Sequence, residues 1–132
     1  MTLQQTFIIN SDLKMSKGKI AVQIAHGEVL YMEDVLNIPQ CGKHADSKIV
    51  ERYFLWREKT NGPIGMMKKI VKKASEQEIL SIVENIPKHE IKCYIVFDKG
   101  MTQVPEDSLT CLCIEPIEEE KAKELFGSLK LL

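Results

Sequence analysis

The chain has 132 residues, of which 44% are hydrophobic and 28% charged, and its formal net charge is −1. This length predicts one domain, over residues 1–132, that buries enough surface to fold without a disulfide or a metal. The composition excludes a disordered or fibrous chain, and no apolar run is long enough to cross a membrane. Because the first residues also lack a secretory signal, we expect a cytoplasmic protein without membrane contact.

Charge is distributed unevenly along the chain. Residues 1–75 contain 12 Lys and Arg against 7 Asp and Glu, whereas residues 76–132 contain 6 against 12. Such a division can place a basic face on a near-neutral protein. The lysine-rich segment therefore has two interpretations, a solvated surface or a face that binds nucleic acid, and its residues are Lys68, Lys69, Lys72 and Lys73.

The four cysteines are interpreted as free thiols that are mostly buried. They stand at positions 41, 93, 111 and 113 and form no C-x-x-C motif. Cys111 and Cys113 would share one face of a strand, where a disulfide between residues i and i+2 is strained. A zinc site built from Cys93, Cys111, Cys113 and a histidine is the alternative, but it lacks the usual spacing of zinc ligands.

The first half of the chain predicts one strand and two helices. β-branched and aromatic residues predict a strand over 6–10, and the polar residues 11–19 predict a loop. Apolar residues at helical spacing predict a helix that starts at Ile20 and ends near Asn37, before Pro39. A second helix is expected after a loop over 38–47, and residues 60–63 end it.

The second half predicts three strands and two helices. Residues 67–73 predict a strand, and Ser75 with Glu78 predicts a capping box at the start of the next helix. The near-continuous apolar run over 91–97 predicts a central strand, covered on both faces. A polar loop over 98–107, a strand over 109–114 and a charged helix over 118–125 complete the chain. This order predicts a four-stranded sheet with helices packed on it.

The first group of candidate functional residues lies where the first helix begins. Lys17 and Lys19 flank Gly18 at that point, where free backbone N–H groups and the helix dipole favour an anion. Gln23 and His26 follow on the same helical face as Lys19. A histidine on a helix is, however, more often a packing residue than a catalyst.

The second group follows the apolar strand over 91–97. Asp98 begins the segment 98–103 at the carboxyl end of that strand, which is the side where ligands usually bind. An Asp after a strand is otherwise a common turn or cap residue. The chain contains no P-loop, no G-x-G-x-x-G, no nucleophile elbow and no H-E-x-x-H motif.

Taken together, these segments resemble the signatures of the type II peptidyl-tRNA hydrolases, the archaeal and eukaryotic kind. The first signature is similar to Asp12-Leu13-Lys14-Met15, Lys17-Gly18-Lys19-Ile20-Ala21, Gln23 and His26. The second is similar to Asp98-x-Gly100-x-Thr102-Gln103-Val104 followed by Thr110, and residues 127–132 resemble the family's C-terminus. The three motifs occur in the family's order, and the resemblance extends over nearly the whole chain.

The resemblance implies a three-layer α/β/α sandwich around a four-stranded mixed sheet. The implied reaction is hydrolysis of the ester between a peptide, or an N-blocked amino acid, and the 3′ end of tRNA. No metal or organic cofactor is implied, the partner is peptidyl-tRNA, and a homodimer is left open. The functional positions of the family fall on Lys19, Gln23, Asp98, Thr102 and Thr110, with Lys17 and His26 beside them.

The chemistry of an acyl ester fits these residue types, since it needs a positioned water, a base and a donor for the oxyanion. We expect Asp98 to orient or deprotonate the water, with the hydroxyls of Thr102 and Thr110 beside it, and Lys19 to stabilise the oxyanion or hold a terminal phosphate. The residues expected to bind the substrate are Lys14, Lys17, Gln23, His26, Lys69 and Lys72, and Lys68 and Lys73 would join them on the tRNA backbone.

Several positions depart from the family pattern, and they support an alternative. Residues 38–66 match the family poorly. Single departures are Asn10 for a usual Arg, Ser16 for Gly, Gly27 for Ala, Lys99 for Ala and Glu115 for Gly. The alternative function is therefore that of a divergent paralogue, which binds RNA or protein without this activity.

Overall fold

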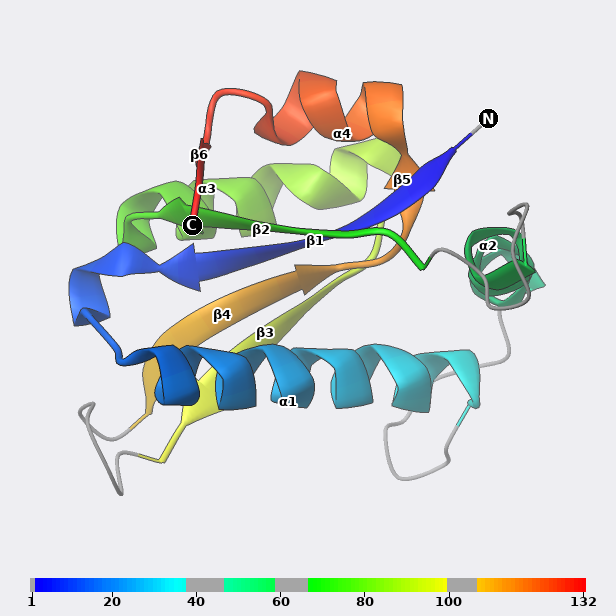
Figure 1. Cartoon of the computed structure of the whole chain (residues 1–132). Helices are drawn as coiled ribbons and strands as arrows, with labels where there is room; N and C mark the ends of the chain where they lie inside the picture. Colours follow the sequence, from blue (N-terminus) through cyan, green and yellow to red (C-terminus); the bar gives the residue numbers. More distant parts are fainter. Residues whose placement is uncertain (1, 38–46, 59–66, 100–106) are drawn as a thin grey trace.

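The computed structural model describes residues 2–37, 47–58, 67–99 and 107–132 (Figure 1). Its elements, in chain order, are β1 (Leu3–Asn10), η1 (Ser11–Leu13), α1 (Lys17–Val35), α2 (Ser47–Glu58), β2 (Lys69–Ala74), α3 (Glu76–Asn85), η3 (Ile86–His89), β3 (Cys93–Asp98), β4 (Ser108–Ile114), β5 (Ile117–Glu118), α4 (Glu119–Phe126) and β6 (Lys130–Leu131). No helix in these described ranges is both long and apolar enough to cross a membrane.

The strands form one mixed sheet in the order β3-β4-β1-β2-β6, and the short β5 pairs with β1 beside this path. β2 runs parallel to β1, while β4 runs antiparallel to both β1 and β3. As a result β1, β2 and β3 point the same way, and their carboxyl ends lie along one edge of the sheet, where α1 begins (Figure 1).

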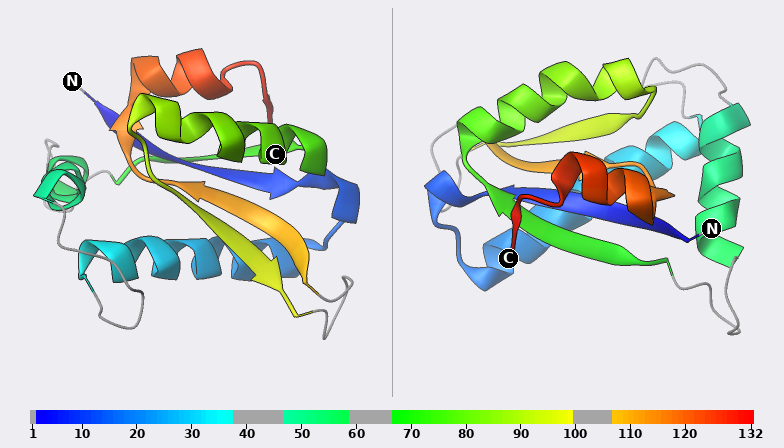
Figure 2. Two further views of the ribbon diagram at one scale, coloured as in Figure 1. Left: turned by 180° about the vertical axis from the view of Figure 1, so that it is seen from behind. Right: turned by 90° about the horizontal axis from the view of Figure 1, so that it is seen from above.

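Helices cover both faces of the sheet, which confirms the α/β/α layers (Figures 1 and 2). α1 lies on one face, with α2 at the end of that core, and α3 and α4 lie on the other. Because side chains alternate along a strand, β1 and β4 contribute to both cores. The residues facing α1 are Phe7, Ile9, Cys111 and Cys113, and those facing α3 and α4 are Ile8, Leu112 and Ile114.

Two expectations about the sheet are wrong in detail. The sheet has six strands rather than four, because the two-residue strands β5 and β6 pair with β1 and β2. β3 is an edge strand rather than a central one, since it pairs with β4 alone among the described strands. Its continuous apolar run arises because helices cover both of its faces: Tyr94 and Val96 pack in the α1 core, and Cys93 and Ile95 in the other.

Helix α1 begins at Lys17, before the first apolar residue of its periodic pattern at Ile20. Ser16 is the N-cap, and its hydroxyl accepts a hydrogen bond from the Lys19 N–H at 3.3 Å. Lys17 and Lys19 therefore lie in the first helical turn, not in the preceding loop. The capping box expected at Ser75 and Glu78 is confirmed at the start of α3.

An ion pair with a buried carboxylate joins α2 to Glu115, the residue that follows β4. The Arg52 Nη1 atom lies 2.8 Å from Oε1 of Glu115, whose side chain is 2% exposed. The other carboxylate oxygen of Glu115 accepts a hydrogen bond from the Lys92 N–H at 2.6 Å. Two departures from the family pattern thus contact each other, since Glu115 stands for a usual Gly and Arg52 lies in the divergent segment.

We expect Arg52→Ala to lower the free energy of unfolding by about 2–3 kcal/mol, because it leaves a buried carboxylate without its cation. Glu51→Ala, at an exposed position of the same helix, is the matched control and should change stability by less than about 0.5 kcal/mol. Urea denaturation of both variants measures the difference. The double variant Arg52→Ala/Glu115→Gln should recover part of the loss, and an additive double-mutant cycle would contradict this assignment.

Candidate functional site

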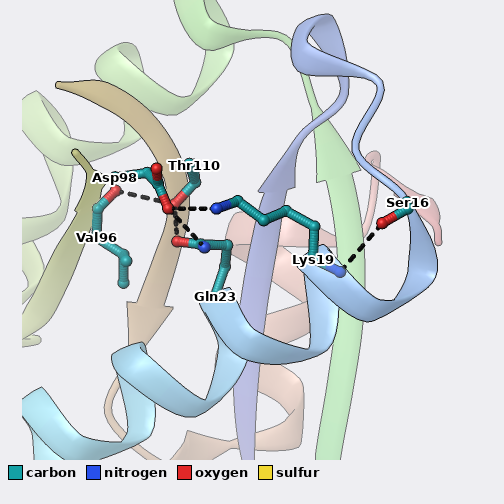
Figure 3. A network of polar contacts seen from close by, with 6 residues as sticks. All are labelled: Ser16, Lys19, Gln23, Val96, Asp98 and Thr110. Carbon is teal, nitrogen blue, oxygen red and sulfur yellow. Dashed lines mark hydrogen bonds and ion pairs between the residues drawn. The ribbon is translucent and has the colours of Figure 1, made fainter. Parts of the chain in front are cut away.

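The candidate site lies at the sheet edge where β1, β2 and β3 end and α1 begins. α1 contributes Lys19 and Gln23, β3 contributes its last residue, Asp98, and β4 contributes Thr110. These four residues, which we call the polar cluster, are far apart in the sequence and come together in one hydrogen-bonded chain (Figure 3). The structure thus brings together four of the five positions that the resemblance indicated.

The polar cluster is centred on one carboxylate oxygen. Oδ2 of Asp98 lies 2.7 Å from Lys19 Nζ and accepts a hydrogen bond from Gln23 Nε2 at 3.1 Å. Gln23 Oε1 in turn accepts a hydrogen bond from the Thr110 hydroxyl at 2.7 Å. The Thr110 hydroxyl also lies 3.2 Å from the carbonyl oxygen of Val96 (Figure 3). Since the amide of Gln23 is held at both ends, its N–H₂ group is fixed toward Asp98.

Burial divides the polar cluster into an accessible end and a buried end. The side chains of Lys19 and Asp98 are 11% and 12% exposed, so they remain accessible to a substrate. Gln23 and Thr110 are completely buried. The ion pair therefore forms the end that solvent reaches, and the Gln23–Thr110 hydrogen bond holds it from inside the protein.

A β-bulge places Thr110 in this cluster. Val96 pairs with Cys111 and Phe97 pairs with Leu109, which leaves Thr110 as an extra residue in β4. Strict alternation would put Thr110 on the side of Leu112, toward α3, but the bulge turns it toward Gln23 of α1. The place of Thr110 in the polar cluster thus depends on an irregularity of the strand that periodicity alone does not predict.

The remaining substrate-binding candidates of the first signature lie around the polar cluster. Lys14 and Lys17 are exposed at the same sheet edge, and Lys14 adopts a left-handed backbone conformation with φ of 49°. His26 is exposed on α1 and lines a groove together with Lys19 and Asp98. Thr102, the fifth position indicated by the resemblance, lies outside the described residues.

The lysine-rich segment does not form one face. Lys72 donates a hydrogen bond to the carbonyl oxygen of Leu129 at 3.0 Å, and Lys68 forms an ion pair with Glu119 of α4. Lys69 lies on the other side of β2, with its Nζ 4.8 Å from the centre of the Trp56 ring. Lys73 is exposed near the end of β2. The lysines of this segment are thus divided between the two faces of the sheet.

Two residues that support the site were not among the candidates. The side-chain amide of Asn10, the last residue of β1, donates to the Leu109 carbonyl at 2.8 Å, and its oxygen accepts from the Asp12 N–H at 3.0 Å. Ser16 caps α1 at Lys19. A serine just before a helix is a known N-cap signal, so the role of Ser16 could have been predicted. Nothing in the sequence indicates that the side chain of Asn10 bonds to the Leu109 carbonyl.

The cysteines do not converge. Cys111 and Cys113 face the α1 core, whereas Cys93 packs in the core on the other face. These thiols are free, and burial raises the pKa of Cys93 and raises the pKa of Cys111 to about 12. In the described part of the chain, no group of three or more His, Cys, Asp or Glu side chains is placed to hold a metal ion. Cys41 lies outside the described residues.

Comparison with known proteins gives a consistent result. Residues 3–132 match the family model for peptidyl-tRNA hydrolase PTH2. The peptidyl-tRNA hydrolase of Thermococcus sibiricus is 34% identical over 98% of this chain and 97% of its own length. That of Methanothermobacter thermautotrophicus is 35% identical, over 98% of this chain and 100% of its own length. The chain therefore belongs to the peptidyl-tRNA hydrolase PTH2 family, as its signatures indicated.

We expect Thr110→Val to lower kcat for peptidyl-tRNA by about tenfold with little change in KM, because Gln23 loses the hydrogen bond that orients it. Thr110→Ser, which keeps the hydroxyl on the bulge, is the matched control and should retain most of the activity. Steady-state kinetics with a purified peptidyl-tRNA measures both variants. Equal activity of the Val and Ser variants would show that the Thr110 hydroxyl has no role in the reaction.

Proposed function

We propose that this protein hydrolyses the ester between a peptide and the 3′-terminal ribose of tRNA at the polar cluster. The observation that carries the proposal is the position of Asp98 beside an open groove. Its Oδ2 lies 2.7 Å from Lys19 Nζ and accepts a hydrogen bond from Gln23 Nε2 at 3.1 Å. A carboxylate next to a cation at an accessible edge supplies both a base and an oxyanion partner.

The proposed reaction uses these two groups in turn. Asp98 accepts a proton from a water molecule, and the water oxygen attacks the carbonyl carbon of the ester. The negative charge that develops on the carbonyl oxygen is stabilised by the Lys19 ammonium, which already lies within hydrogen-bond distance of Asp98. The bond to the ribose oxygen then breaks, and that oxygen takes the proton from Asp98. The products are a free peptide acid and tRNA.

The other members of the polar cluster serve Asp98 in this proposal. Gln23 and Lys19 both contact Oδ2 of Asp98, which holds the carboxylate in one orientation for the proton transfer. A protein that only binds RNA has no use for a carboxylate held in this way, so the site does not favour the alternative of a binding module. Because peptidyl-tRNA arises in translation, we place the reaction in the cytoplasm. The homodimer stays a proposal that sedimentation of the purified chain tests.

We expect Asp98→Asn and Lys19→Met each to lower kcat/KM by roughly 10²-fold or more, because each removes one charge that the transition state needs. Both replacements keep the size of the side chain, so the fold should persist. Release of free tRNA from peptidyl-tRNA measures the rate, and circular dichroism checks the fold.

Lys123→Met is the matched control, since Lys123 is an exposed lysine of α4 on the opposite face of the sheet. It should retain the parent rate. If Asp98→Asn or Lys19→Met keeps near-parent turnover, that residue has no catalytic role. If the parent protein itself is folded and inactive, the proposed function is wrong.

We further propose that Lys14 and Lys17 bind tRNA phosphates, with Lys69 and Lys72 as a second, weaker set. Each phosphate contact releases counterions, so the logarithm of the affinity falls with the logarithm of the salt concentration. Lys14→Gln/Lys17→Gln should raise KM and reduce the salt slope by up to about two units, at roughly 0.7–0.9 per contact.

The Lys69→Gln/Lys72→Gln variant serves as the comparison. Its slope should change by at most about one unit, because Lys72 already donates to Leu129 and Lys69 lies over the Trp56 ring. The value of kcat should be nearly constant in both variants, since these contacts bind ground and transition states alike. If the affinity for tRNA falls with salt at the same slope in the parent and in Lys14→Gln/Lys17→Gln, these two lysines do not bind tRNA phosphates.

A further inference from the structure

A groove of about 650 Å³ extends from the polar cluster along the free edge of the sheet. One wall is the flank of α1, with His26, Val29 and Leu30, and the other wall is formed by the consecutive residues 95–99. Lys19 and Asp98 line the same groove. It is largely apolar, because Val29 is 56% and Phe97 58% exposed. The polar cluster therefore opens onto an extended apolar channel beside a strand edge.

β3 is an edge strand, and no described strand pairs with its outer side along this groove. β3 pairs with β4 in an antiparallel ladder, in which the backbone groups of every second residue face the partner strand. The Lys92 carbonyl faces β4, because it accepts a hydrogen bond from the Glu115 N–H at 3.0 Å, so Tyr94 and Val96 face β4 as well. By the same alternation, the N–H and C=O groups of Ile95 and Phe97 face outward, where no described strand pairs with them. A row of such groups is a template for a further strand.

We propose that the peptide part of peptidyl-tRNA binds as an added strand on the edge of β3, an inference that rests on the proposed function. β3 runs toward Asp98, and the substrate carries its ester at the carboxyl end of the peptide. The peptide therefore lies parallel to β3, with its last residue at Asp98 and its preceding residues along the groove. Its ester carbonyl then reaches Lys19 and Asp98.

This mode of binding suits a substrate whose side chains vary. Hydrogen bonds between main chains are the same for every peptide sequence except at proline. The exposed apolar side chains of Val29 and Phe97 add contact area that imposes no polar requirement. At about 3.3 Å per residue, the six residues of β3 offer pairing for about five peptide residues. The channel therefore predicts recognition by peptide length rather than by peptide sequence.

The first experiment compares substrates of different length with the unaltered protein. N-acetylated peptidyl-tRNAs with one to seven residues should show kcat/KM rising by about tenfold or more and levelling off near five residues. N-methylation of a peptide nitrogen removes one donor. It should reduce kcat/KM by roughly 3- to 10-fold at every second position, and little at the positions between.

The second experiment removes one donor from the protein. Phe97→Pro removes the Phe97 N–H, which points away from β4. Because this N–H takes no part in the pairing of β3 with β4, proline is tolerated at this position of an edge strand. Phe97→Ala is the matched control, because it removes the same exposed side chain and keeps the N–H. The readout is the ratio of kcat/KM for the five-residue substrate to kcat/KM for the one-residue substrate. We expect Phe97→Pro to lower this ratio to near one and Phe97→Ala to lower it less.

The outcomes separate this inference from the proposed function. Strand addition is wrong if all substrates are cleaved with no dependence on length, or if N-methylation has equal effects at adjacent positions. Neither result contradicts the proposed hydrolysis. A change in molecular mass with Phe97→Pro, without a change in length dependence, would show that the edge binds a second copy of this chain. Failure to cleave any substrate would overturn the proposed function and this inference with it.

Discussion

The ion pair of Lys19 and Asp98 is the contact on which the rest of the site depends. It joins the first turn of α1 to the last residue of β3, two elements that are distant in the sequence and pack together in the fold. Both side chains are largely withdrawn from water, so the attraction between them is less screened than at an exposed surface. Gln23 and Thr110 then fix the carboxylate from the buried side. The Asp98 carboxylate is therefore held in one orientation at the end of β3, where its side chain is still partly accessible.

The positions that depart from the family pattern contribute to the structure rather than disturbing it. Asn10 ties the end of β1 to β4, and Ser16 caps the helix that presents Lys19. Glu115 is compensated by Arg52 and by the Lys92 N–H. In each of these three cases the polar side chain has a partner that satisfies it. Asn10 and Ser16 therefore support the end of β1 and the first turn of α1 beside the catalytic candidates, whereas Glu115 follows the opposite end of β4.

Much of the fold could be predicted from the sequence because local signals determine it. The capping box at Ser75 and the period of the apolar residues define α3 and the long strands. The helical spacing of Lys19 and Gln23 also placed them on one side of α1. The position of β3 could not be predicted in this way, because an edge strand covered by helices on both faces has the same apolar pattern as a central strand. Pairing between strands is a long-range property that the pattern of one strand does not contain.

The site was predictable in its members but not in its geometry. The resemblance indicated Thr110 beside Asp98, whereas the structure connects the two through Gln23. That connection needs the bulge in β4, which reverses the side to which Thr110 points. A single extra residue in a strand has no composition signal here, since Ser108–Ile114 reads as an ordinary apolar strand. The role of Thr110 as a support for Gln23 therefore came only from the three-dimensional arrangement.

The distance between α1 and β4 finally explains why Gln23 reaches Thr110 at all. Gly27 lies one turn after Gln23, on the side of α1 that faces the sheet, and a Cβ atom built there would lie 3.0 Å from Cβ of Cys113. A separation this short is rare for real side chains, so an alanine at this position would push the helix and the strand apart unless Cys113 moved. Because Gln23 is on the same face of the helix, such a shift would lengthen its 2.7 Å hydrogen bond to Thr110. The glycine that replaces the family's usual alanine is therefore matched to the cysteine on β4, and this pair sets the spacing at which the buried amide can orient Asp98.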